Sequence, residues 1–189
     1  MQKKWDKRYR DSTEPGQACQ ILREFSHLLP KHGRSLDLAC GLGANALFLA
    51  ELGLDSHAWD ISSVGLNKLT AFAARQGVQV TTLAKDIEKE PPAANSFDII
   101  VVSRFLYRPI CTDLANALRP GGLLYYQTFN KDRLTKHGPD NLDYRLDSNE
   151  LLDLFSSLVI RVYREEGLSG DCSQGLRELS YLVAQKPGH

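Results

Sequence analysis

A short glycine-containing turn between two apolar segments places the strongest constraint on how this chain folds. Residues 35–46 read S-L-D-L-A-C-G-L-G-A-N-A, and Leu36 to Ala39 has the length and apolar character of a buried strand. Ala44 to Leu52 reads as an apolar helix. Gly41 and Gly43 let the backbone turn tightly and approach a ligand where a Cβ would interfere. Strand, turn and helix in this order predict the first unit of a parallel sheet.

The alternation of strands and helices continues along the chain. Further strands are predicted at 57–59, 78–82, 98–102 and 123–128. The predicted helices cover 21–29, the stretch from a cap at Ser62 or Ser63 to Gly77, a segment through Leu114 and Leu118, and a segment that begins with the capping-box-like pair Asp147 and Glu150. Residues 158–164 and 177–184 are extended with no helix between them, so we expect an antiparallel pair.

Composition limits the size and class of the protein. The 189 residues fit one domain, 1–189, with 42% hydrophobic and 24% charged residues. Lys and Arg together number 23, as do Asp and Glu, which disfavours a nucleic-acid partner outside the basic residues 1–10. No apolar run approaches the roughly 18 residues of a membrane span. The four cysteines lie far apart, and the histidines show no metal-ligand spacing. We therefore expect a soluble, cytoplasmic protein without a metal.

Two acidic residues narrow the choice of ligand. Residues 41–46 satisfy G-x-G-x-x-G/A, which is weak evidence alone. Asp60, nineteen residues after Gly41, can accept hydrogen bonds from both hydroxyls of a ribose, or can instead cap the next helix. Asp37, inside the first strand, would repel a pyrophosphate and suits a cationic ligand. S-adenosylmethionine carries an ammonium and a sulfonium and no phosphate. The alternative is a buried Asp37 that is paired internally.

Five segments together resemble a known family. L-D-L-A-C-G-L-G-A-N-A-L-F-L-A is similar to its glycine motif, H-A-W-D-I-S to its ribose-binding motif and L-A-K-D-I-E to its adenine-edge motif. S-F-D-I-I-V-V-S-R-F-L-Y and L-R-P-G-G-L-L-Y-Y-Q-T-F are similar to its fourth and fifth strands. Over roughly residues 5–184 the chain resembles class I S-adenosylmethionine-dependent methyltransferases, in the small TehB-like, tellurite-resistance-type branch. The resemblance implies a Rossmann-like, doubly wound seven-stranded α/β sheet, mostly parallel with the last strand antiparallel. It also implies S-adenosylmethionine as cofactor and S-adenosylhomocysteine as product.

The resemblance also implies a role for individual residues. Asp37 would hold the methionine ammonium, Asp60 the ribose and Asp86 the adenine amine. The other implied cofactor-binding residues are the Ala39, Cys40 and Gly41 backbone and Ser103 at the methionine end, Ile61 and Ile87 beside the adenine, and Trp5 and Tyr9, with Arg8, in an N-terminal segment (1–30) that covers the cofactor. For this segment the alternative is an aromatic anchor that pins the terminus to the domain.

The methyl acceptor is predicted to meet two segments at the carboxyl ends of strands. One is 104–108; the other is the connection 129–148, whose length predicts a lid. Arg104 could attract an anionic acceptor, Tyr107 orient it, and His137 act as a base. Their alternatives are a surface salt bridge, simple packing and a solvated imidazole. From position 103 the chain reads S-R-F-L. The N-P-P-Y type of tetrapeptide, found in many DNA and glutamine methyltransferases, is absent.

These observations predict in-line methyl transfer to a small molecule or small oxyanion. Three alternatives stay open: methylation of RNA or protein, an NAD(P)-dependent oxidoreductase that uses the G-x-G-x-x-A turn, and a non-catalytic module that binds an S-adenosyl ligand. The sequence does not identify the acceptor or the oligomeric state.

Overall fold

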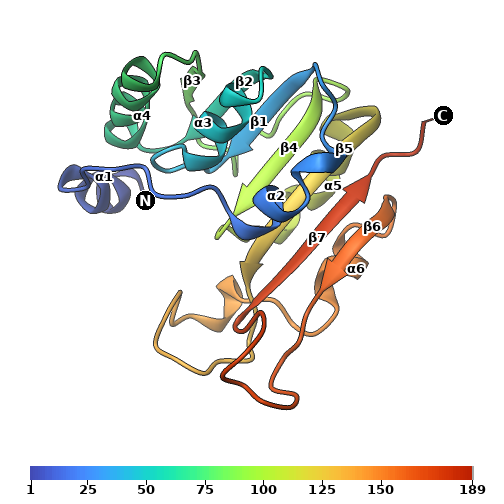
Figure 1. Ribbon diagram of the computed structural model, residues 1–189. Coiled ribbons are helices and arrows are strands. Elements are labelled where there is room, and N and C mark those ends of the chain that lie inside the picture. Colours follow the sequence, from blue (N-terminus) through green and yellow to red (C-terminus); the bar gives the residue numbers. More distant parts are fainter. Residues whose placement is uncertain (189) are drawn as a thin grey trace.

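A seven-stranded sheet forms the centre of the computed structural model, which describes residues 1–188 (Figure 1). The strands are β1 (Arg34–Leu38), β2 (Asp55–Asp60), β3 (Thr81–Ala84), β4 (Phe97–Ser103), β5 (Leu118–Phe129), β6 (Val159–Arg164) and β7 (Leu179–Gln185), in the order β3-β2-β1-β4-β5-β7-β6. β1 to β5 pair in parallel, and β7 runs antiparallel to both β5 and β6. The predicted sheet, including its antiparallel last strand, is confirmed.

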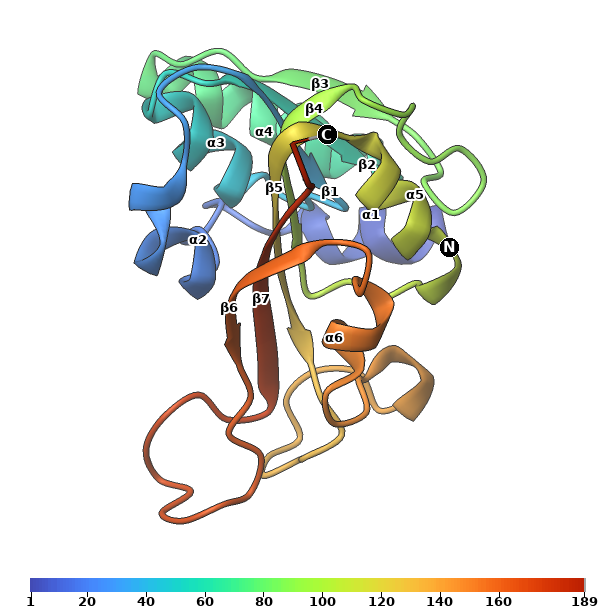
Figure 2. The same cartoon turned by 90° about the vertical axis from the view of Figure 1, so that its right-hand side faces the viewer.

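Helices cover both faces of the sheet. They are α1 (Gln2–Arg10), α2 (Gln20–Glu24), α3 (Ala44–Glu51), α4 (Ser63–Gln76), α5 (Cys111–Ala117) and α6 (Glu150–Leu154), with short 3₁₀ turns at Ser26–Leu28, Arg108–Ile110 and Leu142–Tyr144. Figure 2 shows α2 and α3 on one side and α5 and α6 on the other. In β4, Ile99 and Val101 pack with Ile21 of α2, whereas Ile100 and Val102 pack with Leu114 of α5. A strand buried on both faces reads as a continuous apolar run.

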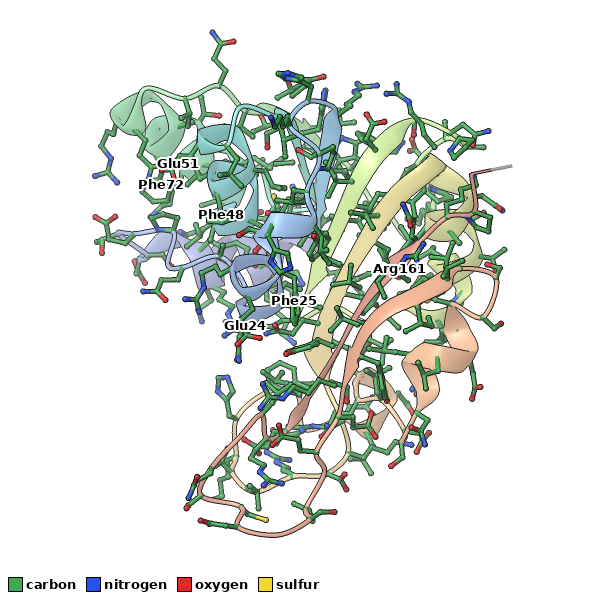
Figure 3. All side chains as sticks on the ribbon, turned by 45° about the vertical axis from the view of Figure 1, so that its right-hand side comes forward. Glu24, Phe25, Phe48, Glu51, Phe72 and Arg161 are labelled. Atoms are coloured by element: carbon green, nitrogen blue, oxygen red, sulfur yellow. The ribbon has the colours of Figure 1, made fainter. Side chains whose placement is uncertain are left out.

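The short helix α2 is held against the sheet by two tyrosines. The Tyr125 hydroxyl of β5 donates to the Phe25 carbonyl at 2.9 Å, and the Tyr181 hydroxyl of β7 donates to Glu24 Oε2 at 2.9 Å. Figure 3 labels Glu24 and Phe25 at the end of this helix. A five-residue helix is not stable alone, so these contacts decide where it lies.

Several element boundaries differ from the sequence prediction. The predicted helix 21–29 is wrong beyond Glu24, because α2 ends there and a 3₁₀ turn follows at Ser26–Leu28. Val78 and Val80 precede β3, because the ladder with β2 begins only at Thr81. Leu118 belongs to β5 and pairs with Phe97, so α5 ends one residue earlier. A further difference concerns the predicted capping box at α6.

That capping box forms only in part. Glu150 Oε2 accepts the Asp147 backbone N–H at 2.8 Å, as the motif predicts. The Asp147 carboxylate pairs instead with Lys131, and the N-cap residue is Asn149 in a left-handed conformation. Among residues 1–188, no helix has the length and apolar character needed to cross a membrane.

The start of α4 connects two helices. Ser62 Oγ accepts the Gly65 N–H at 3.1 Å and so caps α4, and it also lies 2.6 Å from Asp6 Oδ1 on α1. Ser62 is fully buried and Ser63 is exposed. The structure therefore selects Ser62 from the two predicted caps.

Replacing Ser62 by alanine removes both hydrogen bonds. We expect Ser62→Ala to lower the free energy of unfolding by about 1–2 kcal/mol, the range for a lost N-cap. Ser63→Ala, one residue away and exposed, should change it by less than about 0.5 kcal/mol. Urea denaturation of the two variants measures the difference. Equal losses would mean that Ser62 does not cap the helix.

Candidate functional site

A pocket with about 400 Å³ of empty volume lies at the carboxyl ends of the parallel strands. Its lining combines the ends of strands with the N-terminal helix α1, which lies beside these strand ends in Figure 1. The lining residues are Met1, Trp5, Tyr9, Ala39, Asp60, Ile61, Asp86, Ile87, Glu88 and Phe105. Seven of them were among the predicted cofactor-binding residues. Met1, Glu88 and Phe105 were not named individually, although they lie within the predicted segments 1–30, L-A-K-D-I-E (83–88) and 104–108.

The glycine turn is under the steric constraint that the sequence suggested. Gly41 and Gly43 have φ of +58° and +77°, in the left-handed region that favours glycine. A Cβ at Gly43 would lie 2.3 Å from a methyl carbon of Leu69, and one at Gly41 would lie 2.8 Å from the Tyr9 hydroxyl. Gly65 of α4 is equally confined, because its Cβ would lie 2.7 Å from the Gly41 carbonyl oxygen. The turn is therefore pressed between α1 and α4.

Asp60 links the turn to the second strand. Its Oδ2 accepts the Gly41 N–H and its Oδ1 accepts the Ser62 N–H, both at 2.8 Å. The side chain lines the pocket although the residue is 6% exposed, and burial raises its pKa. Each carboxylate oxygen keeps a second lone pair, so Asp60 can hold the backbone and still accept hydrogen bonds from a ligand.

Asp37 lies deeper than the pocket lining. Its Oδ1 accepts from Asn45 Nδ2 at 3.0 Å and its Oδ2 accepts the Ala46 N–H at 3.2 Å. Burial, with a smaller contribution from the Asp60 charge, raises its pKa to about 7. No ion pair within residues 1–188 involves Asp37. The structure thus gives Asp37 internal hydrogen bonds but no positive charge to balance it.

The other predicted cofactor residues surround this centre. Asp86 lines the pocket and pairs with Lys89 at 3.1 Å. Cys40 and Ser103 are half-buried outside the lining, and burial raises the pKa of the Cys40 thiol. In the part of the chain that the structure describes, no group of His, Cys, Asp or Glu side chains is arranged to hold a metal ion.

Helix α1 covers the pocket through aromatic and polar contacts. Trp5 and Tyr9 stack with ring centroids 5.8 Å apart, and both line the pocket. Burial raises the pKa of the Tyr9 hydroxyl. Arg8 lies over the Trp5 ring, outside the lining, and Lys68 of α4 donates to the Arg10 carbonyl at 2.6 Å. None of the α1 residues, all of which the structure describes, is buried, so polar contacts and the two aromatic rings hold the helix.

The three predicted catalytic residues do not lie together in this pocket. Arg104 is exposed, with φ of +55°, and its side chain makes no hydrogen bond or ion pair within residues 1–188. Tyr107 is half-buried against the core. His137 is exposed, with its ring 5.4 Å from that of Phe129. None of them is among the described residues that line the pocket, so their roles stay predictions.

The connection 129–148 is fastened to the sheet at several points. Arg145 is fully buried, and its guanidinium donates to the carbonyls of Asn130 at 2.8 Å, Pro139 at 2.9 Å and His137. Glu178 accepts the Thr135 N–H at 2.7 Å from the other side. A lid movement of this segment would have to break these hydrogen bonds, and the lid stays a prediction.

Comparisons with known proteins identify the fold and a domain. A family model described as a methyltransferase domain matches residues 36–122. The chain is 30% identical over 129 residues to a ubiquinone biosynthesis O-methyltransferase of Parvibaculum lavamentivorans, which covers 66% of this chain and 49% of that protein. The chain thus spans about half the length of this curated relative.

Solved structures share the fold over nearly the whole chain. TehB from Haemophilus influenzae superposes with a TM-score of 0.70 at 22% identity, over 98% of this chain and 66% of that one. A structure reported for the conversion of a disulfide bond into a thioacetal group during echinomycin biosynthesis has a TM-score of 0.73 at 19% identity. That match covers 100% of this chain and 94% of the other.

The contact between α4 and the glycine turn predicts an unusual response to mutation. Alanine in place of a helical glycine normally adds up to about 1 kcal/mol of stability. We expect Gly65→Ala to lower the free energy of unfolding by about 1–3 kcal/mol instead, the range for overpacking, because the new methyl meets the Gly41 carbonyl. Asn67→Ala, exposed on the same helix, is the control and should change it by less than about 0.5 kcal/mol. A stabilised Gly65→Ala in urea denaturation would contradict this packing.

Proposed function

Because residues 36–122 belong to the methyltransferase domain family, we propose that the protein transfers a methyl group from S-adenosylmethionine to a small-molecule acceptor by in-line displacement. The observation that carries the proposal is the arrangement around Asp60. The Asp60 carboxylate lines the pocket and accepts a hydrogen bond from the Gly41 N–H of the glycine turn. Ile61, Ile87 and the second acid, Asp86, line the same pocket. That set suits a ribose, an adenine ring and an exocyclic amine.

Four residues of the lining, together with Asp37 below it, have specific parts in the proposal. Asp60 accepts hydrogen bonds from the ribose hydroxyls, and Asp86 accepts one from the adenine amine. Ile61 packs on the adenine ring, and Ile87 lies beside it. Asp37, beneath the turn, faces the methionine ammonium, whose positive charge compensates the buried carboxylate.

The bound sulfonium supplies the electrophilic methyl group, so the chain has no need of a metal or an acid at this step. In the transfer, the acceptor's lone pair would bond to the methyl carbon as the carbon–sulfur bond breaks with its electron pair on sulfur, and a protonated acceptor would release its proton to water or to a base. The work of the protein is to align the two partners and to exclude water. Trp5 and Tyr9 of α1 are placed to exclude water from the cofactor. In this proposal Arg104, next in sequence to the lining residue Phe105, attracts an anionic acceptor.

Three observations support a small acceptor. The net charge is zero, the segment after β4 reads S-R-F-L, and the curated relative is named for O-methylation in ubiquinone biosynthesis. The basic residues of α1 support the alternative, RNA or protein, because they lie on the helix that covers the pocket. An NAD(P)-dependent oxidoreductase is disfavoured by the negative charge of Asp37 below the turn and by the antiparallel β7. The cytoplasmic location stays a prediction.

Ligand titration separates the nucleotide classes. We expect saturable binding of S-adenosylmethionine in calorimetry and none of NADPH. Asp60→Ala should weaken S-adenosylmethionine binding by at least about tenfold, since it removes charge-assisted hydrogen bonds to the ribose. Asp55→Ala, on the same strand but exposed, is the control and should bind as the unmodified chain does. Saturation by NADPH alone would refute the proposed cofactor, and unchanged binding by Asp60→Ala would remove Asp60 from the site.

A transfer assay with methyl-labelled donor identifies the class of acceptor. We expect label to enter one of the small-molecule pools, which comprise thiols, phenols, small amines and small oxyanions, and not total RNA or protein. Arg104→Gln should raise KM for an anionic acceptor severalfold with little change in donor affinity, because the side chain contributes charge and no packing. Label in RNA or protein would show that the alternative is right.

A further inference from the structure

Asn45, the second residue of α3, connects the acid in β1 to the N-terminal segment. Its Oδ1 accepts the backbone N–H of Cys19 at 2.8 Å, and its Nδ2 donates to Asp37 Oδ1 at 3.0 Å. The residue is 7% exposed. One buried amide thus joins three segments that are separate in the sequence, and the methyl-transfer scheme above gives it no part.

The orientation of this amide follows from its partners. A backbone N–H can only donate, so the oxygen of Asn45 must face Cys19 and the amide NH₂ must face Asp37. The second oxygen of Asp37 meets the Ala46 N–H, another group that can only donate. Both oxygens of Asp37 therefore face donors. This arrangement favours the ionised carboxylate and fixes its plane.

A second amide anchors the same N-terminal segment without contacting Asp37. Gln127 of β5 is buried, and its Oε1 accepts the Ile21 N–H at 3.0 Å. The segment is therefore held at Cys19 and at Ile21 by two amides, of which only Asn45 also donates to the acid. This difference provides a matched control.

We propose that Asn45 is a positioning residue: it orients the Asp37 carboxylate and keeps it a hydrogen-bond acceptor for the ammonium group of the cofactor. The inference rests on the proposed function, since it needs a ligand with a cationic amino-acid tail. Asn45 itself does not have to touch the cofactor. The contact with Cys19 sets the orientation of the Asn45 amide. The N-terminal segment therefore contributes to the ionisation of Asp37.

The electrostatic surroundings of Asp37 make this role measurable. The titratable groups that influence or adjoin it are Asp60 on β2, Cys19 before α2, Cys40 in the turn and Tyr9 on α1. None of these is a cation. Burial raises the pKa of Asp37 to about 7, while the hydrogen bonds from Asn45 and Ala46 lower it. Losing the donor at Asn45 therefore raises the pKa further, and affinity for an ammonium ligand near neutral pH must fall.

The test measures S-adenosylhomocysteine affinity by calorimetry between about pH 5.5 and 8.5, a range that includes the Asp37 pKa of about 7 and a midpoint one unit above it. In the unmodified chain, affinity should rise with pH as Asp37 ionises. Asn45→Asp keeps an oxygen for Cys19 but replaces the donor with a like charge. In this variant the midpoint of the rise in affinity with pH should move up by at least about one pH unit. This shift corresponds to a tenfold loss of affinity at pH values below the midpoint. 5′-Methylthioadenosine, which lacks the amino-acid tail, should bind both proteins equally.

Gln127→Leu is the control for a purely structural role. It removes the Ile21 anchor, so proteolysis within residues 1–18 should be faster, while the pH midpoint stays that of the unmodified chain. Asn45→Asp should shift the pH midpoint and leave the rate of proteolysis within residues 1–18 as in the unmodified chain. If it does not fold in a thermal melt, Asn45→Ala gives the same midpoint test. A midpoint unchanged in both Asn45 variants, or shifted equally by Gln127→Leu, would overturn the inference. If the unmodified chain binds no S-adenosylhomocysteine, the proposed function fails and the inference with it.

Discussion

The carboxylate of Asp60 holds together the backbone segments on which the pocket depends. It accepts N–H groups from the glycine turn at Gly41 and from Ser62 before α4. Ser62 then caps α4 and contacts α1 through Asp6. Removing a carboxylate from water is costly unless hydrogen bonds replace the lost hydration. Those two N–H groups provide that replacement, so the position of the turn, the start of α4 and the cover of the pocket all follow from one buried acid.

Much of the fold and of the cofactor pocket could be predicted because the signals are local. The apolar run 98–102 fits a strand buried on both faces, and the glycines at 41 and 43 fit a turn that no Cβ could enter. In parallel sheets, ligands bind outside the carboxyl ends of the strands. Asp60 ends β2 and Asp86 lies two residues after β3, so locating the strands was enough to place both acids at one pocket.

The parts that could not be predicted depend on contacts between distant segments. Asn45 meets Cys19 across 26 positions and Gln127 meets Ile21 across 106, and neither amide carries a local signal of its partner. Arg145 reads as an ordinary loop cation, yet the backbone carbonyls of the connection bury it completely. Arg104, Tyr107 and His137 were chosen because their segments follow parallel strands and because of their side-chain chemistry. Neither criterion determines the direction in which a loop side chain points.

The two acids beneath and beside the glycine turn explain how this pocket can select its ligand. Asp37 and Asp60 are both buried, and the pKa of each is raised. The backbone N–H groups and the Asn45 amide solvate these carboxylates but contribute no full positive charge. A ligand with an ammonium group gains by supplying that charge, whereas a pyrophosphate would add to the repulsion. A cationic ligand would therefore relieve the electrostatic cost of burying these two acids. Under our proposal, such a ligand stabilises the folded chain as it binds, through the acid that the Asn45 amide orients.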